Sequence, residues 1–206
     1  MDTRERIIKT SLALFNEHGS LNITTNHIAK ELSISPGNLY YHFRNKEEII
    51  RFIFDRWVLS FDRLWQRESS IPELSDLVEI VDKSCLLFYD YRFFYLDLPA
   101  LLSRDKVLRE RYVKNKNIRF RDVAKIIDFM NNAGLLERPL SGVERDAFIN
   151  VFWTGTEFLI SSMYIHGEKI TAGNIRIRLL QFRFLLKPYV KPAVWTAIMQ
   201  LLAISD

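Results

Sequence analysis

Residues 34–50, ISPGNLYYHFRNKEEII, place polar-tipped aromatic rings directly after a Ser-Pro-Gly corner. Tyr40, Tyr41 and His42 each combine a flat ring with a hydroxyl group or a ring nitrogen that can form a hydrogen bond. A buried helix usually carries Leu and Ala at such positions, and a solvent-exposed helix usually carries Glu and Lys. The three side chains therefore suit a surface that binds a partner through rings and hydrogen bonds.

The neighbouring residues favour a nucleic acid as that partner. Gly37 lets another backbone approach closely, and Asn38 can bond a base edge or a phosphate. A tyrosine ring can contact thymine methyl groups or sugars, while its hydroxyl can reach a phosphate. Lys46 and Thr25 are placed to hold phosphates from either side, and helix N-termini add N–H donors for the same anions.

These side chains need helices to position them, and the first quarter of the chain predicts four. Apolar residues recur at helical spacing, and capping residues mark where helices begin. Thr24 or Thr25 caps the second helix, Pro36 opens the third at its first position, and Asn45 caps the fourth. The expected helices run from residue 3 to 18, from 24 or 25 onward, from 36 onward, and from 46 to about 67.

Two short helices joined by the SIS corner at residues 33–35, and packed on a preceding helix, form a helix-turn-helix. The second helix of such a pair enters the major groove of DNA. Leu39 and Phe43 are spaced i, i+4, so we expect both to face the first helix. The alternative is that the aromatic residues of the third helix are a packed core cluster, with Tyr40 lying half in the core.

Residues 4 to about 50 resemble the DNA-binding domain of the TetR family of bacterial transcriptional regulators. The resemblance is carried by RERIIKTSLALFNEHG and by ITTNHIAKELSISPGNLYYHFRNKEEII. Ser33 stands where many members of the family have Gly at the helix-turn-helix corner. The resemblance assigns DNA contact to Thr25, Asn26, Ser35, Pro36, Gly37, Asn38, Tyr40, Tyr41, His42 and Lys46.

The resemblance also implies an architecture and a function, although it covers only about a quarter of the chain. It implies an all-α homodimer, with an N-terminal three-helix bundle containing the helix-turn-helix at residues 1–50. A larger helical C-terminal domain at 51–206 would bind ligand and dimerise, and the boundary would lie inside the fourth helix. The expected function is a repressor that binds a palindromic operator in double-stranded DNA and is released by a small apolar or aromatic effector.

The remaining sequence predicts longer helices, because only seven glycines and six prolines interrupt the chain. We expect helices at residues 73–88 or beyond, at 105–132, and from a Ser141 cap to about residue 166. A break is expected near Pro99, after the aromatic stretch FYDYRFFYL. A last helix would begin near Thr171, meet Pro188 and resume after Pro192.

Aromatic residues with one acidic residue form the candidate effector site. They could line a cavity for a small molecule or could be ordinary core, and the sequence favours neither. Glu157 lies in the apolar stretch 147–165, where an unpaired carboxylate is costly. It could pair with Arg176 or Arg178, or could anchor a ligand. The candidate residues are Phe88, Tyr91, Phe94, Phe152, Trp153 and Glu157.

Composition excludes several other classes of protein. No nucleophile, acid–base pair or phosphate loop is visible, so we expect no enzyme and no cofactor. The three histidines of the first 50 residues match no zinc spacing, so we expect no metal. Cys85 is the only cysteine, which suits a reducing compartment. The charged N-terminus lacks a signal sequence, and polar residues interrupt the stretch 147–165. We therefore expect a cytoplasmic protein and no membrane partner.

The charge distribution leaves an alternative function open. The net charge is +4, but residues 1–50 carry six basic and six acidic side chains. The surplus lies in residues 103–125, with nine basic and three acidic side chains, and a solvated helix face explains it most simply. An N-terminal domain without net charge allows a second interpretation, in which the fold is a helical adaptor or small-molecule-binding protein that has lost DNA binding.

Overall fold

A computed structural model describes residues 2–65 and 74–203, and within these ranges it contains helices and no strand. The all-α prediction is confirmed. The only β-type pairing in the described residues is one antiparallel bridge between Leu136 and Val190. The helices are α1 Thr3–His18, α2 Thr25–Glu31, α3 Pro36–His42, α4 Lys46–Trp65, α5 Leu74–Asp90, α6 Arg92–Arg104, α7 Lys106–Asn132, α8 Gly142–Glu157, α9 Leu159–Ile165, α10 Ala172–Gln181, α11 Arg183–Leu186 and α12 Pro192–Ala203.

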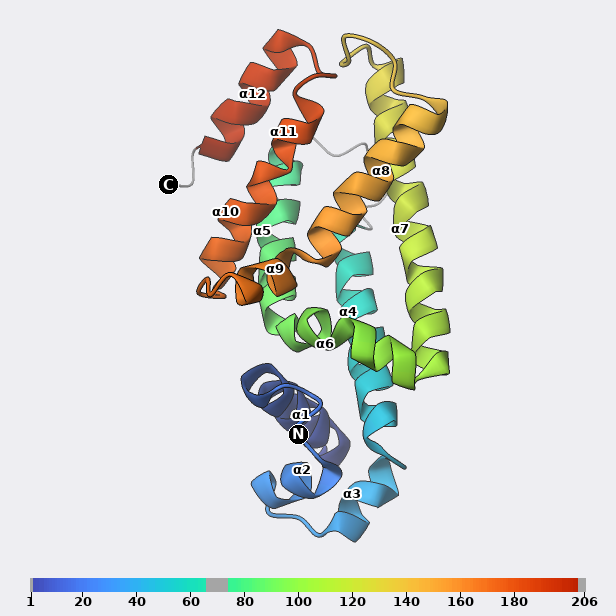
Figure 1. Ribbon diagram of the computed structural model, residues 1–206, viewed down its shortest axis with the longest axis vertical. Helices are drawn as coiled ribbons and strands as arrows, with labels where there is room; N and C mark the ends of the chain where they lie inside the picture. The colour runs from blue at the N-terminus through green and yellow to red at the C-terminus, as the bar shows by residue number, and fades with distance from the viewer. Residues whose placement is uncertain (1, 66–73, 204–206) are drawn as a thin grey trace.

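Helices α1, α2 and α3 form a small unit at one end of the molecule, at the bottom of Figure 1. The expected spacing of apolar residues places Leu39 and Phe43 in its core, with 0% and 1% of their surfaces exposed. Phe15 and Ile28 are equally buried beside them. We call α1–α3 together with the start of α4 the head.

Helix α4 leaves the head and continues without a break into the larger body formed by α5–α12 (Figure 1). One hydrophobic core runs through both parts, from Ile7 and Leu39 in the head to Met163 and Ile175 in the body. The expected end of the fourth helix at about residue 67 and the expected start of the next helix at residue 73 both lie outside the described residues. A shared helix and a shared core make the head and body mechanically continuous.

The predicted break near Pro99 is wrong, because Pro99 lies inside α6. Proline lacks an N–H group, so the carbonyl four residues earlier loses its helical partner. That carbonyl belongs to Tyr95, and the Ser161 hydroxyl donates to it at 2.9 Å from α9. The chain instead breaks after α6 at Asp105, whose carboxylate accepts from the Leu108 N–H at 3.0 Å and caps α7.

The long helix expected from Ser141 to about residue 166 is two helices, α8 and α9. They are separated at Phe158, which has φ −100° and ψ 7°. The break lets α9 turn toward α6 and bring Ser161 to the Tyr95 carbonyl. The final helices follow the prediction more closely, because Thr171 caps α10 and α12 resumes at Pro192.

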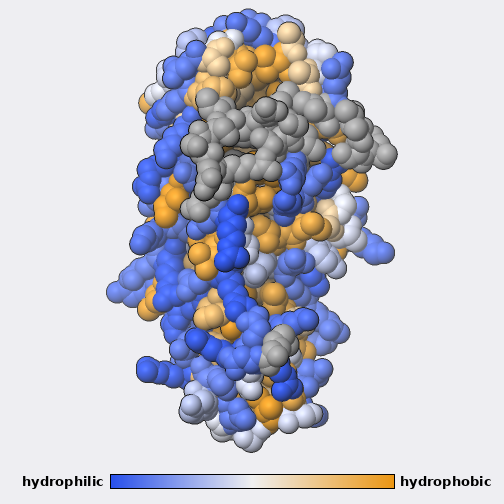
Figure 2. Space-filling model, turned by 180° about the vertical axis from the view of Figure 1, so that it is seen from behind, coloured by the Kyte–Doolittle hydropathy of each residue, from blue (hydrophilic) through white to orange (hydrophobic). Residues whose placement is uncertain are grey.

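The far end of the body has a second, smaller hydrophobic core that includes Ile127, Leu140 and Val190. Seen from behind, the head end is mainly hydrophilic, and apolar side chains gather over the body (Figure 2). None of the described helices combines the length and the apolar character that crossing a bilayer requires.

Candidate functional site

The corner between α2 and α3 is the most unusual backbone in the head. Ser33 has φ +54°, and it is the only residue other than glycine with positive φ in the described chain. This left-handed conformation costs a residue with a Cβ atom about 1–2 kcal/mol. Backbone bonds from Ser33 N–H to Lys30 O and from Ile34 N–H to Ala29 O, each 3.0 Å long, hold the corner in place. The corner therefore keeps helix-turn-helix geometry without glycine.

Polar side chains fix where α2 and α3 begin. The Thr24 hydroxyl accepts from the His27 N–H at 3.3 Å, and the His27 ring accepts from the Thr24 N–H at 3.4 Å. The Ser35 hydroxyl accepts from the Asn38 N–H at 3.1 Å, and Pro36 occupies the first helical position. Ser35 is thus used as a helix cap, and His27 takes a structural role that its sequence position did not suggest.

The outer face of α3 carries the residues that the sequence singled out. Pro36, Gly37 and Asn38 are exposed, and 86% of the Tyr41 surface is accessible. The His42 ring meets the Tyr41 ring edge to face, with centroids 5.1 Å apart. The alternative of a packed aromatic cluster does not fit Tyr41.

Tyr40 bridges the two helices rather than projecting freely. Its hydroxyl lies 2.9 Å from the Thr25 hydroxyl, and 48% of its surface is exposed. Asn26 is exposed on α2 beside Thr25. The first turn of α2 and the middle of α3 therefore present one continuous polar surface, the reading surface, which consists of Thr25, Asn26, Pro36, Gly37, Asn38, Tyr40, Tyr41 and His42.

Lys46 lies apart from the reading surface. Its ammonium group donates to the Ser20 carbonyl at 2.8 Å and to the Ile23 carbonyl at 2.9 Å. Burial lowers the pKa of Lys46 from its ordinary value. Two of its three donors thus hold the loop between α1 and α2, so Lys46 builds the head.

Two acidic residues of the head are held by partners outside α3. Glu5 pairs with Arg56 of α4, and this hydrogen bond lowers the pKa of the Glu5 carboxyl. Glu48 accepts from the Arg44 N–H at 2.6 Å at the start of α4. Helix α3 has no acidic residue, and the exposed Arg44 lies two residues after its end at His42. The zero net charge of residues 1–50 therefore hides a reading surface without negative charge.

Two protein-family models cover most of the chain. The model described as "Bacterial regulatory proteins, tetR family" matches residues 7–52. The model described as "Bacterial transcriptional repressor" of the TetR type matches residues 61–197, which is more than half of the chain. The chain belongs to the TetR family. It is a transcriptional regulator with a helix-turn-helix DNA-binding domain, and the family consists of regulators rather than enzymes.

Relatives of known structure share the TetR-family fold over almost the whole chain. A TetR-family regulator from Marinobacter aquaeolei VT8 is 32% identical, with a TM-score of 0.88 over 99% of this chain and 98% of that one. A regulator from Saccharomonospora viridis is 21% identical, with a TM-score of 0.70 over 91% and 97% of the two chains.

A curated relative matches less than a third of the chain. An HTH-type transcriptional regulator of Staphylococcus aureus (strain bovine RF122 / ET3-1) is 39% identical over 61 residues, 30% of this chain. The chain spans about a third of the length of the curated relatives it matches.

Direct contacts join the head of this TetR-family chain to α6 of the body. The Phe15 and Phe93 rings lie 5.2 Å apart. The Asp97 carboxylate accepts from the Ser20 N–H at 2.7 Å and from the Ser20 hydroxyl at 2.5 Å. Asn16 accepts from the Phe93 N–H at 3.1 Å at the start of α6. A shift of α6 therefore acts on α1 through bonded groups.

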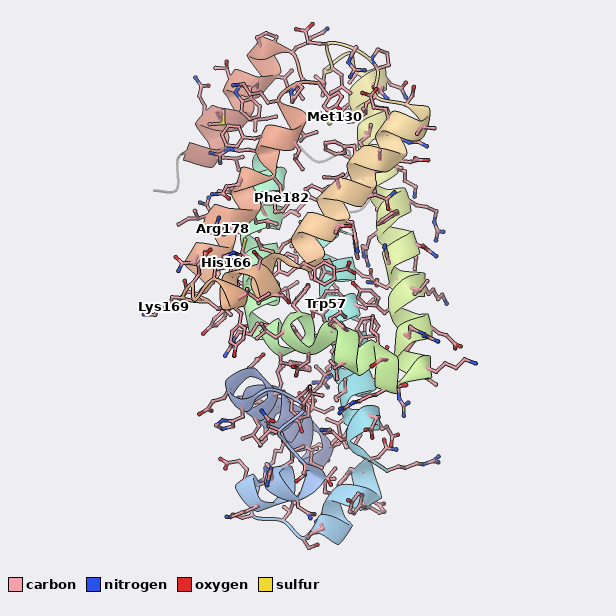
Figure 3. The ribbon with its side chains drawn as sticks, viewed as in Figure 1. Trp57, Met130, His166, Lys169, Arg178 and Phe182 are labelled. Atoms are coloured by element: carbon pink, nitrogen blue, oxygen red, sulfur yellow. The ribbon has the colours of Figure 1, made fainter. Side chains whose placement is uncertain are left out.

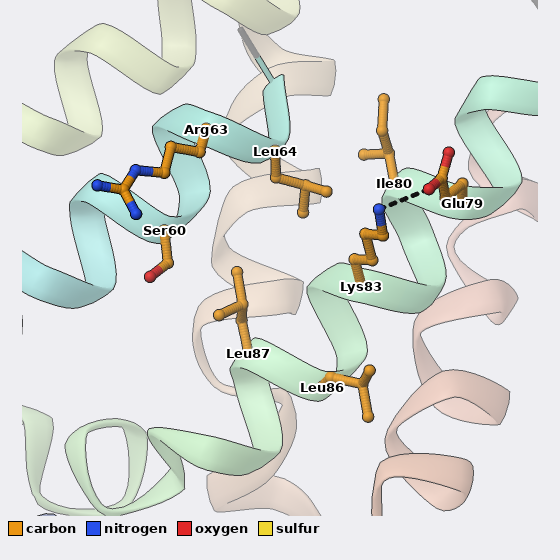
Figure 4. A pocket seen from close by; sticks show the side chains of 8 residues that line it. All are labelled: Ser60, Arg63, Leu64, Glu79, Ile80, Lys83, Leu86 and Leu87. Carbon is orange, nitrogen blue, oxygen red and sulfur yellow. Dashed lines mark ion pairs between the residues drawn. The ribbon is translucent and has the colours of Figure 1, made fainter. Parts of the chain in front are cut away.

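The body contains a cavity of about 400 Å³ between α4 and α5 (Figure 4). Leu64, Ile80 and Leu87 give it an apolar wall, and the Lys83 ammonium pairs with Glu79 at 2.5 Å on its rim. None of the six predicted effector residues lines this cavity.

The six predicted effector residues do not all lie together. Phe88 contacts the Phe61 and Tyr95 rings, and Tyr91 is half-buried near the head. Phe152 packs edge to face on Phe182, with centroids 5.9 Å apart. Only Phe94, Trp153 and Glu157 meet around a common neighbour, Tyr112.

The salt bridge expected for Glu157 is not formed. Arg176 pairs with Asp82 at 2.5 Å, and Arg178 pairs with Glu168. Glu157 instead accepts hydrogen bonds from the Tyr112 hydroxyl and, at 3.1 Å, from the Trp153 indole N–H. The expectation failed because Tyr112 is 45 residues away along the chain, and helical spacing does not reveal such a neighbour.

Proposed function

We propose that this TetR-family chain is a ligand-responsive repressor that acts as a homodimer on a palindromic operator. The observation that carries the proposal is the exposed face of α3, where Asn38 and Tyr41 project from a rigidly capped helix that has no acidic residue. Residues 1–50 would form the DNA-binding unit, and residues 51–206 would form the effector-binding and dimerisation unit.

In the proposed complex, the N-terminal end of α3 enters the major groove. Asn38 can bond a base edge, and Tyr41 can contact a thymine methyl group or a sugar. Tyr40 and Thr25, already bonded to each other, would meet a phosphate together. Arg44 adds a positive charge beside the groove. Lys46 and Ser35 contribute by holding this surface in shape.

Exposed apolar residues on the C-terminal helices support the dimer. Val151 and Phe158 are 57% and 43% exposed on and just after α8, and Ile177 is 60% exposed on α10. Large apolar side chains gathered on one region commonly mark a protein interface. A two-fold dimer presents two copies of α3, which matches an inverted repeat with half-sites about 34–36 Å apart or somewhat more.

An effector in the body would weaken DNA binding by favouring a different spacing of the two heads. It can shift the equilibrium only by its difference in affinity for the two states. Continuous α4 and the Asp97–Ser20 bonds offer a route from the body to the head.

Relatives of similar fold support effector binding but not one effector chemistry. The S. viridis regulator was solved in complex with choline, and SmeT was solved in complex with triclosan. Both are under 25% identical to this chain, so its own residues must decide the ligand.

A gel shift on the DNA upstream of the chain's own gene tests the proposed function. We expect binding that weakens steeply with salt, because phosphate contacts release counterions. A variant with Tyr41→Ala should lose the shift.

The head's equal numbers of acidic and basic residues favour the adaptor as a second candidate. Failure to bind any genomic DNA at low salt would support the adaptor and reject the repressor.

A further inference from the structure

Helices α4, α6, α7 and α8 bring polar groups together inside the body, away from the reading surface. Figure 3 shows Trp57 in the interior, and its ring centroid lies 5.9 Å from that of Tyr95. Tyr95 is joined through Phe94 to Tyr112, which bonds Glu157. We call the group the Glu157 cluster; its members are Trp57, Phe94, Tyr95, Tyr112, Trp153 and Glu157, together with the buried Asn115 one helical turn after Tyr112 on α7.

The Glu157 carboxylate has neutral partners. It accepts from the Tyr112 hydroxyl and from the Trp153 indole, whereas the described ion pairs of Arg176 and Arg178 use other carboxylates. Burial first, and then Glu157, raise the pKa of Tyr112 far above its ordinary range. The phenol therefore keeps its proton and donates, but no positive charge balances Glu157 among its described contacts.

Three further polar atoms of the cluster are fully buried without a hydrogen-bond partner in the described structure. They are the indole nitrogen of Trp57 and the hydroxyl of Tyr95, which lie near enough to interact with each other, and the side-chain oxygen of Asn115. These residues are only 7%, 5% and 6% exposed. Unsatisfied buried polar groups are rare in proteins and call for an explanation such as a water or a ligand. Water could satisfy the hydrogen bonds, and a bound cation would in addition balance the carboxylate of Glu157, which is only partly buried.

The walls of the cluster are aromatic. The centroids of Phe94 and Trp57 lie 6.0 Å apart, and those of Phe94 and Tyr112 lie 6.1 Å apart. The face of an aromatic ring attracts a cation, and the attraction grows when water is excluded. A carboxylate bonded to Tyr112 and Trp153 beside these rings therefore favours an organic cation over a neutral molecule of the same shape, and it repels an anion.

We propose that the Glu157 cluster is the effector site, and that it takes an organic cation whose positive group lies against Glu157 and the surrounding rings. This inference rests on the proposed function, because it names the chemistry of the effector. The rings must separate for the ligand to enter, so the arrangement described here is the closed form. Movement of Tyr95 or Tyr112 would pass directly to α6 and α7, which meet next to the head.

Isothermal titration calorimetry with three probes tests the inference on the full-length protein. Benzyltrimethylammonium supplies the cation, and neopentylbenzene has the same shape with carbon in place of nitrogen. Benzoate supplies an anion that the cavity near Arg63 and Lys83 could accept instead. We expect the cation to bind about 10-fold or more tightly than either other probe. Equal binding of the neutral probe, tighter binding of benzoate, or no binding of the cation at millimolar concentration would overturn the inference.

Two matched variants on α8 locate the site. Glu157→Gln removes the charge but retains an acceptor for Tyr112 and Trp153, so the fold should survive. It should weaken binding of the cation about 10-fold or more. Asp146→Asn makes the same change of charge at an exposed position and should leave binding within about 2-fold. Unchanged binding in Glu157→Gln would place any cation elsewhere and reject the cluster as the site.

The same protein preparation is assayed for binding to its upstream DNA. DNA binding without cation binding would reject the cation site and leave the proposed repressor intact. Cation binding without any DNA binding would reject the repressor and leave the ligand site.

Discussion

Tyr41 is the most exposed of the large hydrophobic and aromatic side chains in the head. Its ring is held against His42, and neither residue forms part of the hydrophobic core. Exposing such a ring to water has no benefit for folding, so its position is best explained by a partner.

Replacing Tyr41 by Ala should weaken operator binding about 5- to 150-fold, the equivalent of about 1–3 kcal/mol for one specific contact. Tyr41→Phe keeps the ring and should lose less affinity for the operator than Tyr41→Ala. Fluorescence anisotropy with labelled operator measures both. Val143→Ala, a truncation at an exposed site on α8, serves as the control. Equal affinity for the wild type and Tyr41→Ala would remove Tyr41 from the interface.

Lys46 should act on stability before it acts on DNA. Lys46→Met leaves the Ser20 and Ile23 carbonyls without their donor, and each unsatisfied buried group costs about 1–3 kcal/mol. Urea denaturation should therefore show a loss of at least about 1 kcal/mol, whereas Lys30→Met on the exposed face of α2 should show almost none.

The salt dependence of operator binding separates the two roles of Lys46. A residue that contacts phosphate would lower the slope of log affinity against log salt by about 1 in the Lys46→Met variant. A lower slope with unchanged stability would support the phosphate contact assigned by family resemblance and contradict the structural role.

The sequence revealed the residue types of the reading surface because helix spacing and caps are local properties. It did not reveal that Lys46 reaches carbonyls 26 and 23 residues away, or that Glu157 meets Tyr112. Both contacts depend on how distant helices pack. A basic residue near the start of a helix looks the same in sequence whether it holds a phosphate or a loop.

At the scale of elements, helix starts were more predictable than helix breaks. Thr171 and Pro36 mark the beginnings of α10 and α3 through their own chemistry. Pro99 should have ended a helix by the same logic, but Ser161 satisfies the carbonyl that proline leaves free. That compensation comes from 66 residues away, beyond the reach of local rules.

Gly155 illustrates packing between elements, because a Cβ atom there would lie 2.1 Å from the Phe182 ring. The neighbour that leaves no room for a larger residue at this position belongs to the same chain. Figure 3 shows Phe182 beside α8.

Gly155→Ala should lower the free energy of unfolding by about 1–3 kcal/mol, because the ring must shift in a packed interior. In Gly173→Ala, on α10, the added Cβ atom meets no atom closer than 4.0 Å. This variant should instead raise the free energy of unfolding by up to about 1 kcal/mol. Thermal or urea unfolding of the pair isolates the contact with Phe182. A stabilised Gly155→Ala variant would show that the Phe182 ring moves away from α8 easily.

At the scale of the whole molecule, the all-helical architecture followed from few glycines and prolines and from helical periodicity throughout. The pairing of copies is not written in local patterns, but exposed apolar residues on α8–α11 indicate a surface for it. The head and body share one core, so the geometry of the proposed dimer would determine where the two reading surfaces point.

Ile177→Glu should break the proposed dimer, because it buries a charge in an apolar interface. We expect its dimer dissociation constant to rise about 100-fold or more, measured by analytical ultracentrifugation. Val113→Glu makes a comparable change at a 48% exposed site on α7 and should leave the dimer intact. An unaffected Ile177→Glu dimer would place the interface on another face.

Selection of bound sequences from random DNA, using protein whose dimeric state has been measured, tests the account most directly. If the chain is a homodimer that places α3 in the major groove, the selection should enrich an inverted repeat whose half-sites are centred about 34–36 Å apart or somewhat more. The Tyr41→Ala variant should lose this enrichment. Recovery of unselected sequence, or of a single unpaired half-site bound equally well by Tyr41→Ala, would contradict it.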